Sequence, residues 1–354
     1  MSPTRNSKNS RRQHQGPTIA DVAEEAGVSP MTVSRVINGE DRVRIKTRKR
    51  VEDAIAKLQY TPNLSARQLA GAQPIHVGLI YDNPSSAYLS EFLVGALEQT
   101  SQLNVQLTVE KSENPQGAMA TAEAMVARGV DGLLLPPPLS DSSLVLAYLE
   151  TLAIPTVVAA SPHTGMNVSA VSINDEQAAY EMTRHIIELG HRRIGFIAGN
   201  PNQSATDLRL TGYQKALRDF KLTVNPQLIA QGQFSYRTGL EAATKLLSLA
   251  SPPTAIFASN DDMAAATVAV AHRLGLNVPQ QLTVCGFDDS LMATTIWPEL
   301  TTIHQPIIEM SRTAVKLLVE KIRAARNDQE PESEHLVLDF TFMKRESDAP
   351  LSFE

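Results

Sequence analysis

The sequence predicts an all-α N-terminal segment followed by an α/β core of two doubly wound, parallel-sheet subdomains. Residues 17–60 have the pattern of short, closely punctuated helices, and beyond Pro74 apolar strands alternate with amphipathic helices. Buried strands that alternate with helices indicate parallel βαβ units. Because about 270 residues follow this pattern, which is long for one doubly wound sheet, we expect two similar subdomains.

Charge is distributed unevenly along the chain. The net formal charge is −6, yet the first 71 residues carry 13 Lys and Arg against 7 Asp and Glu, and the remainder carries 19 against 31. Attraction to phosphate acts over roughly a Debye length, so a basic head on an acidic body favours a polyanionic partner for the head alone. Chance unevenness is the alternative. Residues 1–16 lack apolar periodicity and are expected to form a disordered basic tail.

The sequence indicates a soluble protein of the cytoplasm. The polar N-terminus has no apolar core of a secretory signal, and no apolar run reaches the roughly 20 residues that span a bilayer. The single cysteine, Cys285, excludes an intramolecular disulfide and fits a reducing compartment.

Residues 17–62 predict a helix-turn-helix unit. Thr18 can cap a first helix, with Asp21 placed as in a capping box, and Gly27 can end it. Ser29 can cap the second helix, with Pro30 at its first position. A third helix is expected over about residues 46–59, and its apolar residues recur at helical spacing.

The second helix of such a unit can enter the major groove of DNA. Val33 and Val36 would face the core, together with Ile37, and leave Met31 and Arg35 on the outer face. Arg35 suits a bidentate contact with a guanine edge, and Met31 suits an apolar contact with a thymine methyl group. An ordinary three-helix bundle with a solvated arginine is the alternative.

Residues 18–71 closely resemble the headpiece and hinge of the lac repressor (LacI/GalR) family. The motifs DVA, AGVS, TVSRVIN, Y-x-PN and AR-x-L stand at the family's spacing, and the resemblance extends from Pro17 to about Arg345. It implies a bacterial transcription repressor that binds near-palindromic operator DNA as a homodimer and is then associated with the nucleoid. It also implies release from DNA by a sugar or sugar derivative.

The resemblance implies the DNA contacts residue by residue. Positions 30, 31 and 35 would read bases, but Pro30-Met31 departs from the Tyr-Gln pair of the family's prototype, so the operator sequence does not carry over. Phosphates would be bound by Thr18, Ser29, Thr32, Ser34 and Asn38. In the hinge, residues 63–74, Leu69 would wedge the minor groove open, flanked by Asn63, Ala66 and Arg67. A passive linker is the alternative, although Gly and Ser are scarce in it.

The core resembles periplasmic sugar-binding proteins, which hold a ligand between two subdomains. Open α/β sheets bind ligands beyond the carboxyl ends of their strands, and carboxylates, amides and an aromatic face suit a sugar. The expected effector contacts are Asp82, Tyr88, Phe92, Arg209, Phe234, Asn260, Asp288 and Gln305. Each could instead cap a strand end or form a turn. Ala160 replaces an acid of the prototype, and Tyr88 and Phe92 are larger than its residues, so we expect the ligand to be bound differently.

The expected boundaries follow from the same resemblance. The effector-binding and dimerisation core is placed at residues 75–346, with an N-terminal subdomain of residues 75–174 and 305–331. The C-terminal subdomain is placed at residues 175–304 and 332–346, and residues 347–354 form a tail. That tail is too short and polar for the leucine heptad of tetrameric relatives, so we predict a dimer.

Enzyme activity is not expected. The sequence contains no Walker pattern, G-x-S-x-G elbow, H-E-x-x-H, or G-x-G-x-x-G after the first strand, and its histidines are scattered. We therefore expect no cofactor, no metal site and no membrane partner. Two other functions stay open: a corepressor-dependent repressor, in which the ligand tightens DNA binding, and a cytoplasmic sugar-binding protein or enzyme with a vestigial head.

Overall fold

A computed structural model describes residues 17–37, 43–58, 60, 74–83, 85–162, 168–329 and 332–351. The chain divides into two compact units, Met1–Pro74 and Ile75–Glu354. The expected basic tail, residues 1–16, lies outside the described residues. So do five predicted DNA contacts, namely Asn38, Asn63, Ala66, Arg67 and Leu69.

The described part of the first unit is a three-helix headpiece, with α1 (Ile19–Ala26), α2 (Pro30–Ile37) and α3 (Ile45–Leu58). The predicted capping box is present, because the Thr18 side chain accepts from the Asp21 backbone N–H while the Asp21 carboxylate accepts from that of Thr18. Gly27 ends α1 at φ +61°, a left-handed conformation that glycine adopts without a Cβ penalty.

The headpiece has its own apolar core. Val22 of α1, Val33 of α2 and Val51 of α3 are fully buried in it, and Val36 and Tyr60 pack against the same cluster. The small side chains of Ala23, Ala26 and Ala54 complete the cluster. All three helices therefore contribute to one core, which fixes α2 against α1 and α3.

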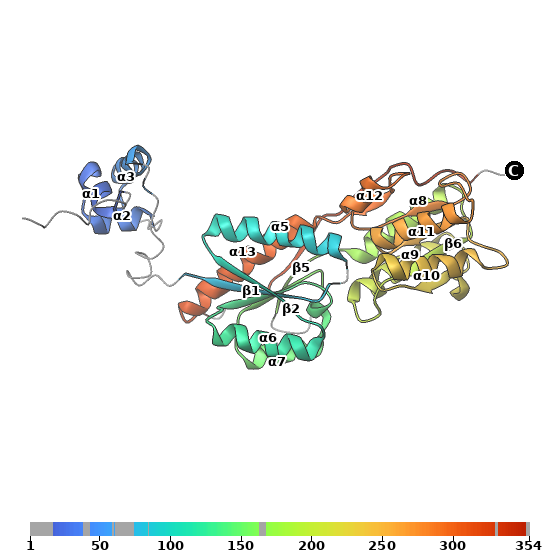
Figure 1. The fold of residues 1–354 in the computed structure, drawn as a ribbon, viewed down its shortest axis with the longest axis horizontal. Helices are drawn as coiled ribbons and strands as arrows, with labels where there is room; N and C mark the ends of the chain where they lie inside the picture. Colours follow the sequence, from blue (N-terminus) through green and yellow to red (C-terminus); the bar gives the residue numbers. More distant parts are fainter. Residues whose placement is uncertain are drawn as a thin grey trace, which may run out of the picture. The chain divides into compact units, whose positions relative to one another are not determined.

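The first subdomain of the core is a six-stranded parallel sheet in the order β11-β5-β4-β3-β1-β2. Figure 1 shows α5 and α13 on one face of this sheet and α6 and α7 on the other. Its strands are β1 (His76–Tyr81), β2 (Gln106–Lys111), β3 (Gly132–Leu135), β4 (Thr156–Ala159), β5 (Ser169–Ile173) and β11 (His335–Leu338). Its helices are α5 (Ser86–Leu103), α6 (Pro115–Ala127), the 3₁₀ turn η1 (Leu139–Asp141), α7 (Ser143–Thr151) and α13 (Ile307–Arg326).

The second subdomain is a four-stranded parallel sheet in the order β7-β6-β8-β9. The helix pairs α8/α9 and α10/α11 cover it (Figure 1). Its strands are β6 (Ile194–Ala198), β7 (Ile229–Gln231), β8 (Ala255–Ala258) and β9 (Thr283–Cys285). Its helices are α8 (Asp175–Glu188), α9 (Ser204–Asp219), η2 (Pro226–Leu228), α10 (Tyr236–Leu247), α11 (Asp261–Arg273) and α12 (Leu291–Thr295). The predicted fold class is confirmed.

The chain passes between the subdomains three times, near residues 174, 305 and 340, and β10 (Thr302–His304) pairs antiparallel with β12 (Thr341–Met343) beside the last two passages. One boundary is corrected. Residues 332–346 were assigned to the C-terminal subdomain, but His335–Leu338 forms β11 and pairs with β5 of the first sheet.

The expected tail is also corrected in part, because its first residues pack on the second subdomain. Ser347 is fully buried; its hydroxyl donates to the Val284 carbonyl and accepts from the Thr301 N–H at 2.8 Å. Asp348 accepts from His185 at 2.8 Å. These buried polar groups are satisfied by the folded second subdomain, so the segment is an integral part of it. Within the described residues, no helix has the length and apolar character needed to cross a membrane.

Candidate DNA-binding surface and effector cleft

The outer face of α2 carries the predicted base-reading residues. Pro30, Met31 and Arg35 are exposed, and the Met31 side chain is 65% accessible. An exposed methionine of this size is available for an apolar contact with a partner. Thr18 and Ser29 are exposed as well, whereas Thr32 and Ser34 are half-buried.

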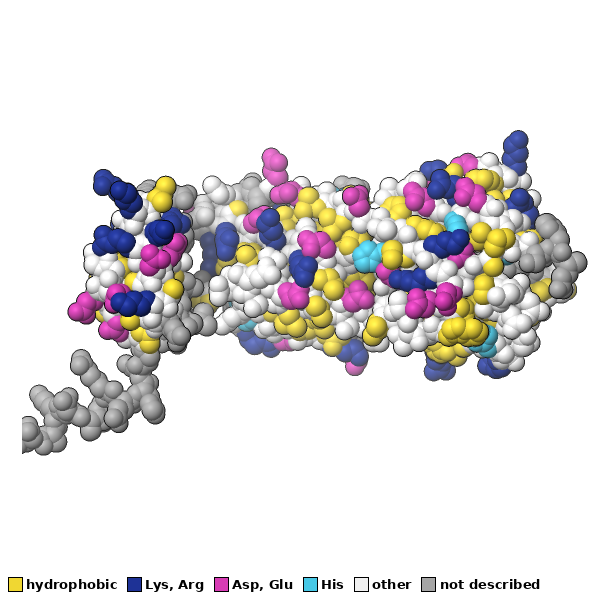
Figure 2. All heavy atoms as spheres, turned by 90° about the horizontal axis from the view of Figure 1, so that it is seen from above, with side chains coloured by type: hydrophobic (Ala, Val, Ile, Leu, Met, Phe, Trp, Pro, Cys, Tyr) yellow, Lys and Arg dark blue, Asp and Glu magenta, His cyan; other side chains and the backbone are white. Residues whose placement is uncertain are grey.

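The turn before α2 is held from both sides. The Ser29 hydroxyl accepts from the Thr32 N–H at 3.2 Å and so caps α2. From α3, the Arg50 guanidinium donates to the carbonyls of Ala26 and Gly27, the latter at 3.1 Å. These contacts fix the direction in which α2 leaves the turn. Figure 2 shows Lys and Arg side chains interspersed with Asp and Glu on both the headpiece and the core.

A second candidate site lies between the two subdomains of the core. It is a cavity of about 30 Å³, room for a few waters, so a sugar ring requires its walls to move apart. Six of the eight predicted effector contacts line it: Tyr88, Arg209, Phe234, Asn260, Asp288 and Gln305. The remaining wall is made by Asn83, Ser85, Pro137, Ala160, Gln203 and Ala205.

The other two predicted contacts, Asp82 and Phe92, do not line this cavity. Phe92 is fully buried and stacks on the Tyr88 ring, with 6.1 Å between the ring centroids. It therefore supports Tyr88, which lines the cavity. Asp82 is half-buried beside Lys111 at the end of β1. Burial raises the pKa of Asp82, and the Lys111 charge opposes that shift.

Arg209 is the central polar residue of the cavity. It comes from the second turn of α9 and is only 4% exposed. Its Nε donates to Asp175 Oδ1 at 2.8 Å, and its Nη1 donates to the Ser259 carbonyl at 2.6 Å and lies 3.7 Å from Asp288 Oδ1. The guanidinium also stacks on Phe287, 3.6 Å from the ring centroid. A buried arginine so held has one fixed orientation.

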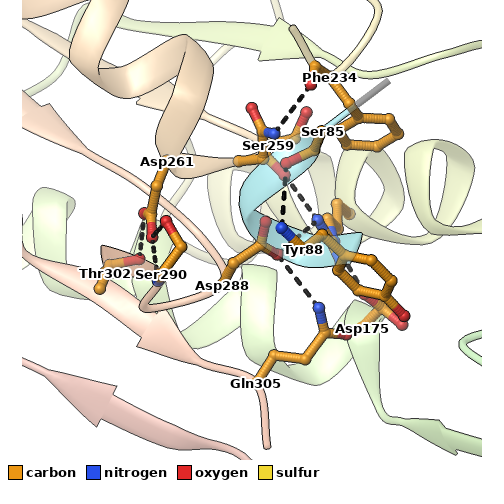
Figure 3. Close-up of polar contacts among 12 residues, drawn as sticks. Ser85, Tyr88, Asp175, Phe234, Ser259, Asp261, Asp288, Ser290, Thr302 and Gln305 are labelled. Carbon is orange, nitrogen blue, oxygen red and sulfur yellow. Dashed lines mark hydrogen bonds and ion pairs between the residues drawn. The ribbon is translucent and has the colours of Figure 1, made fainter. Parts of the chain in front are cut away.

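Asp288 and Gln305 lie on the side of the cavity that faces Arg209. The Gln305 amide donates to Asp288 Oδ1 at 3.1 Å (Figure 3). Asp288 follows β9 at φ +113°, a conformation that strains an L-residue and is characteristic of functional loops. Burial raises the pKa of Asp288 well above its usual value, against the opposing charge of Arg209. Burial likewise raises the pKa of Asp175.

Several buried polar atoms around the cavity have no hydrogen-bond partner among the described residues. They are Tyr88 Oη, Gln305 Oε1, Gln203 Nε2, Ser204 Oγ and Ser140 Oγ. Burial of such atoms costs free energy unless something pairs with them. Of these residues Tyr88, Gln203 and Gln305 line the cavity, so they can offer donors and acceptors to whatever enters it.

Phe234 supplies the aromatic wall. It adopts φ +56° after β7, and Asn260 Nδ2 donates to its carbonyl at 3.2 Å. Its ring lies against Gly199, where an added Cβ would come within 1.9 Å of the ring. Gly199 therefore allows the ring to reach this position, which the sequence pattern alone does not reveal.

Two contacts cross the cleft directly. Ser85, at the start of α5, donates to Asp262 Oδ2 of α11 at 2.7 Å. Asp141, in η1, accepts from the Ser204 N–H at 3.2 Å at the start of α9, and from the Ser161 hydroxyl at 2.8 Å. Opening of the cleft must break both crossing contacts.

Sequence analysis did not identify Ser85 and Gln203 as cleft residues. Both occupy the N-cap positions of helices that begin at the cleft, Ser85 for α5 and Gln203 for α9. The only available signal was their place after strands β1 and β6, which is shared by many turn residues.

The comparisons with known proteins agree with this architecture. Residues 18–63 match the family "Bacterial regulatory proteins, lacI family", and residues 183–347 match the "Periplasmic binding protein-like domain". Catabolite control protein A of Priestia megaterium is 33% identical over 308 residues, which cover 86% of this chain and 92% of that protein.

Two solved structures are similar over nearly the whole chain. A complex of the transcriptional regulator CelR with cellobiose is 31% identical, with a TM-score of 0.72, and covers 94% of this chain and 99% of its own. A lac repressor dimer bound to operator and the anti-inducer ONPF is 27% identical, with a TM-score of 0.71, and covers 95% and 100%.

A helix-turn-helix headpiece on a two-subdomain, periplasmic-binding-protein-like core defines a class of DNA-binding transcription regulators. Within that class, the chain belongs to the lacI family of bacterial regulatory proteins.

Proposed function

We propose that this regulator is a repressor that binds a near-palindromic operator as a homodimer and releases it when a sugar or sugar derivative enters the cleft. The observation that carries the proposal is the cavity between the subdomains, where a fixed Arg209, the amides of Asn260 and Gln305 and the ring of Phe234 meet. Planar polar groups suit vicinal hydroxyls, and an aromatic face suits the C–H side of a sugar.

The headpiece supplies the DNA side of the proposal. Arg35 and Met31 on α2 would read base edges, and Thr18, Ser29, Thr32, Ser34 and Asn38 would bind phosphates. A two-fold dimer matches a two-fold operator. The hinge residues Asn63, Ala66, Arg67 and Leu69 would link the two functions, with Leu69 as a minor-groove wedge.

The cleft can control the hinge because both crossing contacts, Ser85 with Asp262 and Asp141 with Ser204, depend on the subdomain separation. A ligand that changes this separation shifts the first subdomains of a dimer relative to each other. Typical allosteric coupling of about 1–3 kcal/mol would weaken operator binding roughly 5- to 150-fold.

The test is a titration on a selected operator. Duplexes are selected from a random pool with the full-length chain, and the affinity of the best palindrome is measured by fluorescence anisotropy with and without each of a panel of sugars. We expect one sugar to lower the affinity and Leu69→Ala to abolish specific binding. A sugar that raises the affinity would instead assign corepression, and no preference over random DNA would refute the proposal.

A further inference from the structure

Resting on the proposed function, we infer that the cleft takes an uncharged polyol and excludes phosphorylated and carboxylated sugars. Neither the family nor the shape of the cavity decides the charge of the ligand. The groups around the cavity that are already paired, and those that are not, do decide it.

Arg209 is the one cationic side chain among the described residues that line the cavity. Its charge is already engaged, because Asp175 accepts from its Nε at 2.8 Å and Asp288 lies 3.7 Å from its Nη1. The Ser259 carbonyl accepts a further hydrogen bond, from Arg209 Nη1. An anionic ligand would have to displace carboxylates that are themselves buried at 3% and 6% exposure.

The groups around the cavity are carboxyls rather than further cations. Asp261, Asp262 and Glu91 lie near enough to Asp288 to raise its pKa further, and Asp141 does the same for Asp175. Asp261 is held by the Ser290 N–H at 2.8 Å and the Thr302 hydroxyl at 2.7 Å (Figure 3). A phosphate or carboxylate placed here finds carboxyl groups and no unengaged cation to neutralise it.

Helix N-termini often bind anions, and at each helix that begins at the cleft one backbone N–H already has an acceptor. The Ser204 N–H at the start of α9 donates to the Asp141 carboxylate. At the start of α11, the Met263 N–H donates to Asn260 Oδ1 at 3.0 Å. At the start of α5, the Tyr88 N–H donates to Ser85 Oγ at 3.3 Å.

The unpaired groups call for a ligand that carries protons to donate. Gln305 Oε1 can only accept, and Gln305 is 1% exposed. Tyr88 Oη can donate or accept, and Gln203 Nε2 can only donate. A sugar hydroxyl donates and accepts at once and so satisfies all three. Phosphorylated and carboxylated sugars carry hydroxyls as well, so these groups select a polyol, and its anionic derivatives are excluded by the engaged Arg209.

The experiment compares matched neutral and anionic ligands on the full-length protein. Its melting temperature is measured with glucose against glucose 6-phosphate and glucuronate, and with ribose against ribose 5-phosphate. A deproteinised bacterial extract, separated on an anion exchanger into neutral and anionic fractions, is tested in parallel. A bound ligand raises the melting temperature by mass action. We expect only the neutral sugars and the neutral fraction to raise the melting temperature. The matching anionic sugars should bind at least about 100-fold more weakly.

Two variants of Gln203 provide the matched control. Gln203→Lys adds a cation at the cavity wall and is expected to reduce the discrimination against the phosphate by about tenfold or more, whereas Gln203→Glu leaves the phosphate excluded. A larger rise with an anionic member or fraction in the unmodified protein overturns the inference and leaves the proposed function standing. No rise with any fraction refutes the small-molecule effector itself and the inference with it.

Discussion

Two buried tyrosines of the core have opposite hydrogen-bonding status. Tyr88, in the cleft, leaves its hydroxyl without a described partner, whereas the Tyr213 hydroxyl donates to the Ile194 carbonyl at 2.8 Å. Burial raises the pKa of both phenols, so both are neutral at physiological pH. The contrast indicates that Tyr88 is set up for a ligand and Tyr213 for stability.

Tyr88→Phe is therefore expected to raise the free energy of unfolding by about 1 kcal/mol and to weaken effector binding, because it removes an unpaired polar atom that a ligand would satisfy. Tyr213→Phe is the matched control and should lower the free energy of unfolding by about 1 kcal/mol, since a made hydrogen bond is lost. Urea denaturation of both variants measures the two changes. If both substitutions changed the free energy of unfolding in the same direction, Tyr88 would not be a residue whose hydroxyl is kept for a ligand.

Glu91 predicts a pH dependence. Burial, together with the nearby Asp289 charge, raises the pKa of Glu91 from 4.5 to about 7. A carboxyl whose folded-state pKa is raised contributes stability that is present below its unfolded pKa and is lost as the pH rises through the folded value. Stability should thus fall between pH 5 and pH 8.

Glu91→Gln should remove part of this loss and stabilise the protein at pH 8 by about 1 kcal/mol, after allowance for solvent screening of a half-buried group. At pH 5 the substitution should have little effect. Denaturant unfolding at the two pH values measures the difference, with the exposed Glu150→Gln as the control. A stabilisation equal at both values would rule out Glu91 as the cause.

At the level of elements, α2 is the part of the headpiece whose orientation matters most. Its inner residues Val33 and Val36 are buried, and Arg35 stands exposed on the other side. Arg35→Ala should lower affinity for the selected operator by about 1–3 kcal/mol and relax the base preference at one position, because one bidentate base contact is lost.

Lys57→Ala is the control for that experiment, because it also removes one positive charge from the headpiece. Lys57 lies on α3 and pairs with Glu25 of α1 at 2.7 Å, so its charge is already partly neutralised. Its substitution should change the operator affinity little and leave the base preference intact. Both affinities are measured by anisotropy at one fixed salt concentration, because phosphate contacts depend on salt.

How far the sequence predicts each element depends on where its polar groups are satisfied. The caps at Thr18 and Ser29 act locally, so α1 and α2 were predicted with their starting residues. β5 has a weaker strand pattern because two serines interrupt its apolar residues; both are buried through distant partners, Ser169 with the Glu334 N–H and Ser172 with His335. Long-range pairing of this kind leaves no local pattern.

The same reasoning applies to the cleft. Arg209 and Gln305 were predicted from the family resemblance, and Asp288 also from its place beyond a strand end; the fold brings the three together. Phe92 was expected to contact the effector, but its position on α5 turns it into the core behind Tyr88. Whether a residue of α5 faces the core or the cavity depends on how the helix is rotated about its own axis. That rotation is set by how α5 packs on the sheet, which the local sequence does not show.

At the scale of the whole molecule, the headpiece and the core have separate apolar clusters. A chain that starts at Ile75 should therefore fold on its own, melt cooperatively and keep the ligand-dependent rise in melting temperature, while losing operator binding. Calorimetry with and without the identified sugar measures this. An unfolded fragment would mean that the core needs the headpiece.

The late return of the chain has a consequence for biosynthesis. β11 completes the edge of the first sheet next to β5, and Ser347 and Asp348 complete the second subdomain through Val284, Thr301 and His185. The headpiece can fold as soon as it leaves the ribosome, since domains fold as units during synthesis. Neither half of the core can be completed until residues 335–348 have been synthesised, so a nascent chain can carry a folded headpiece before it has a complete effector-binding core.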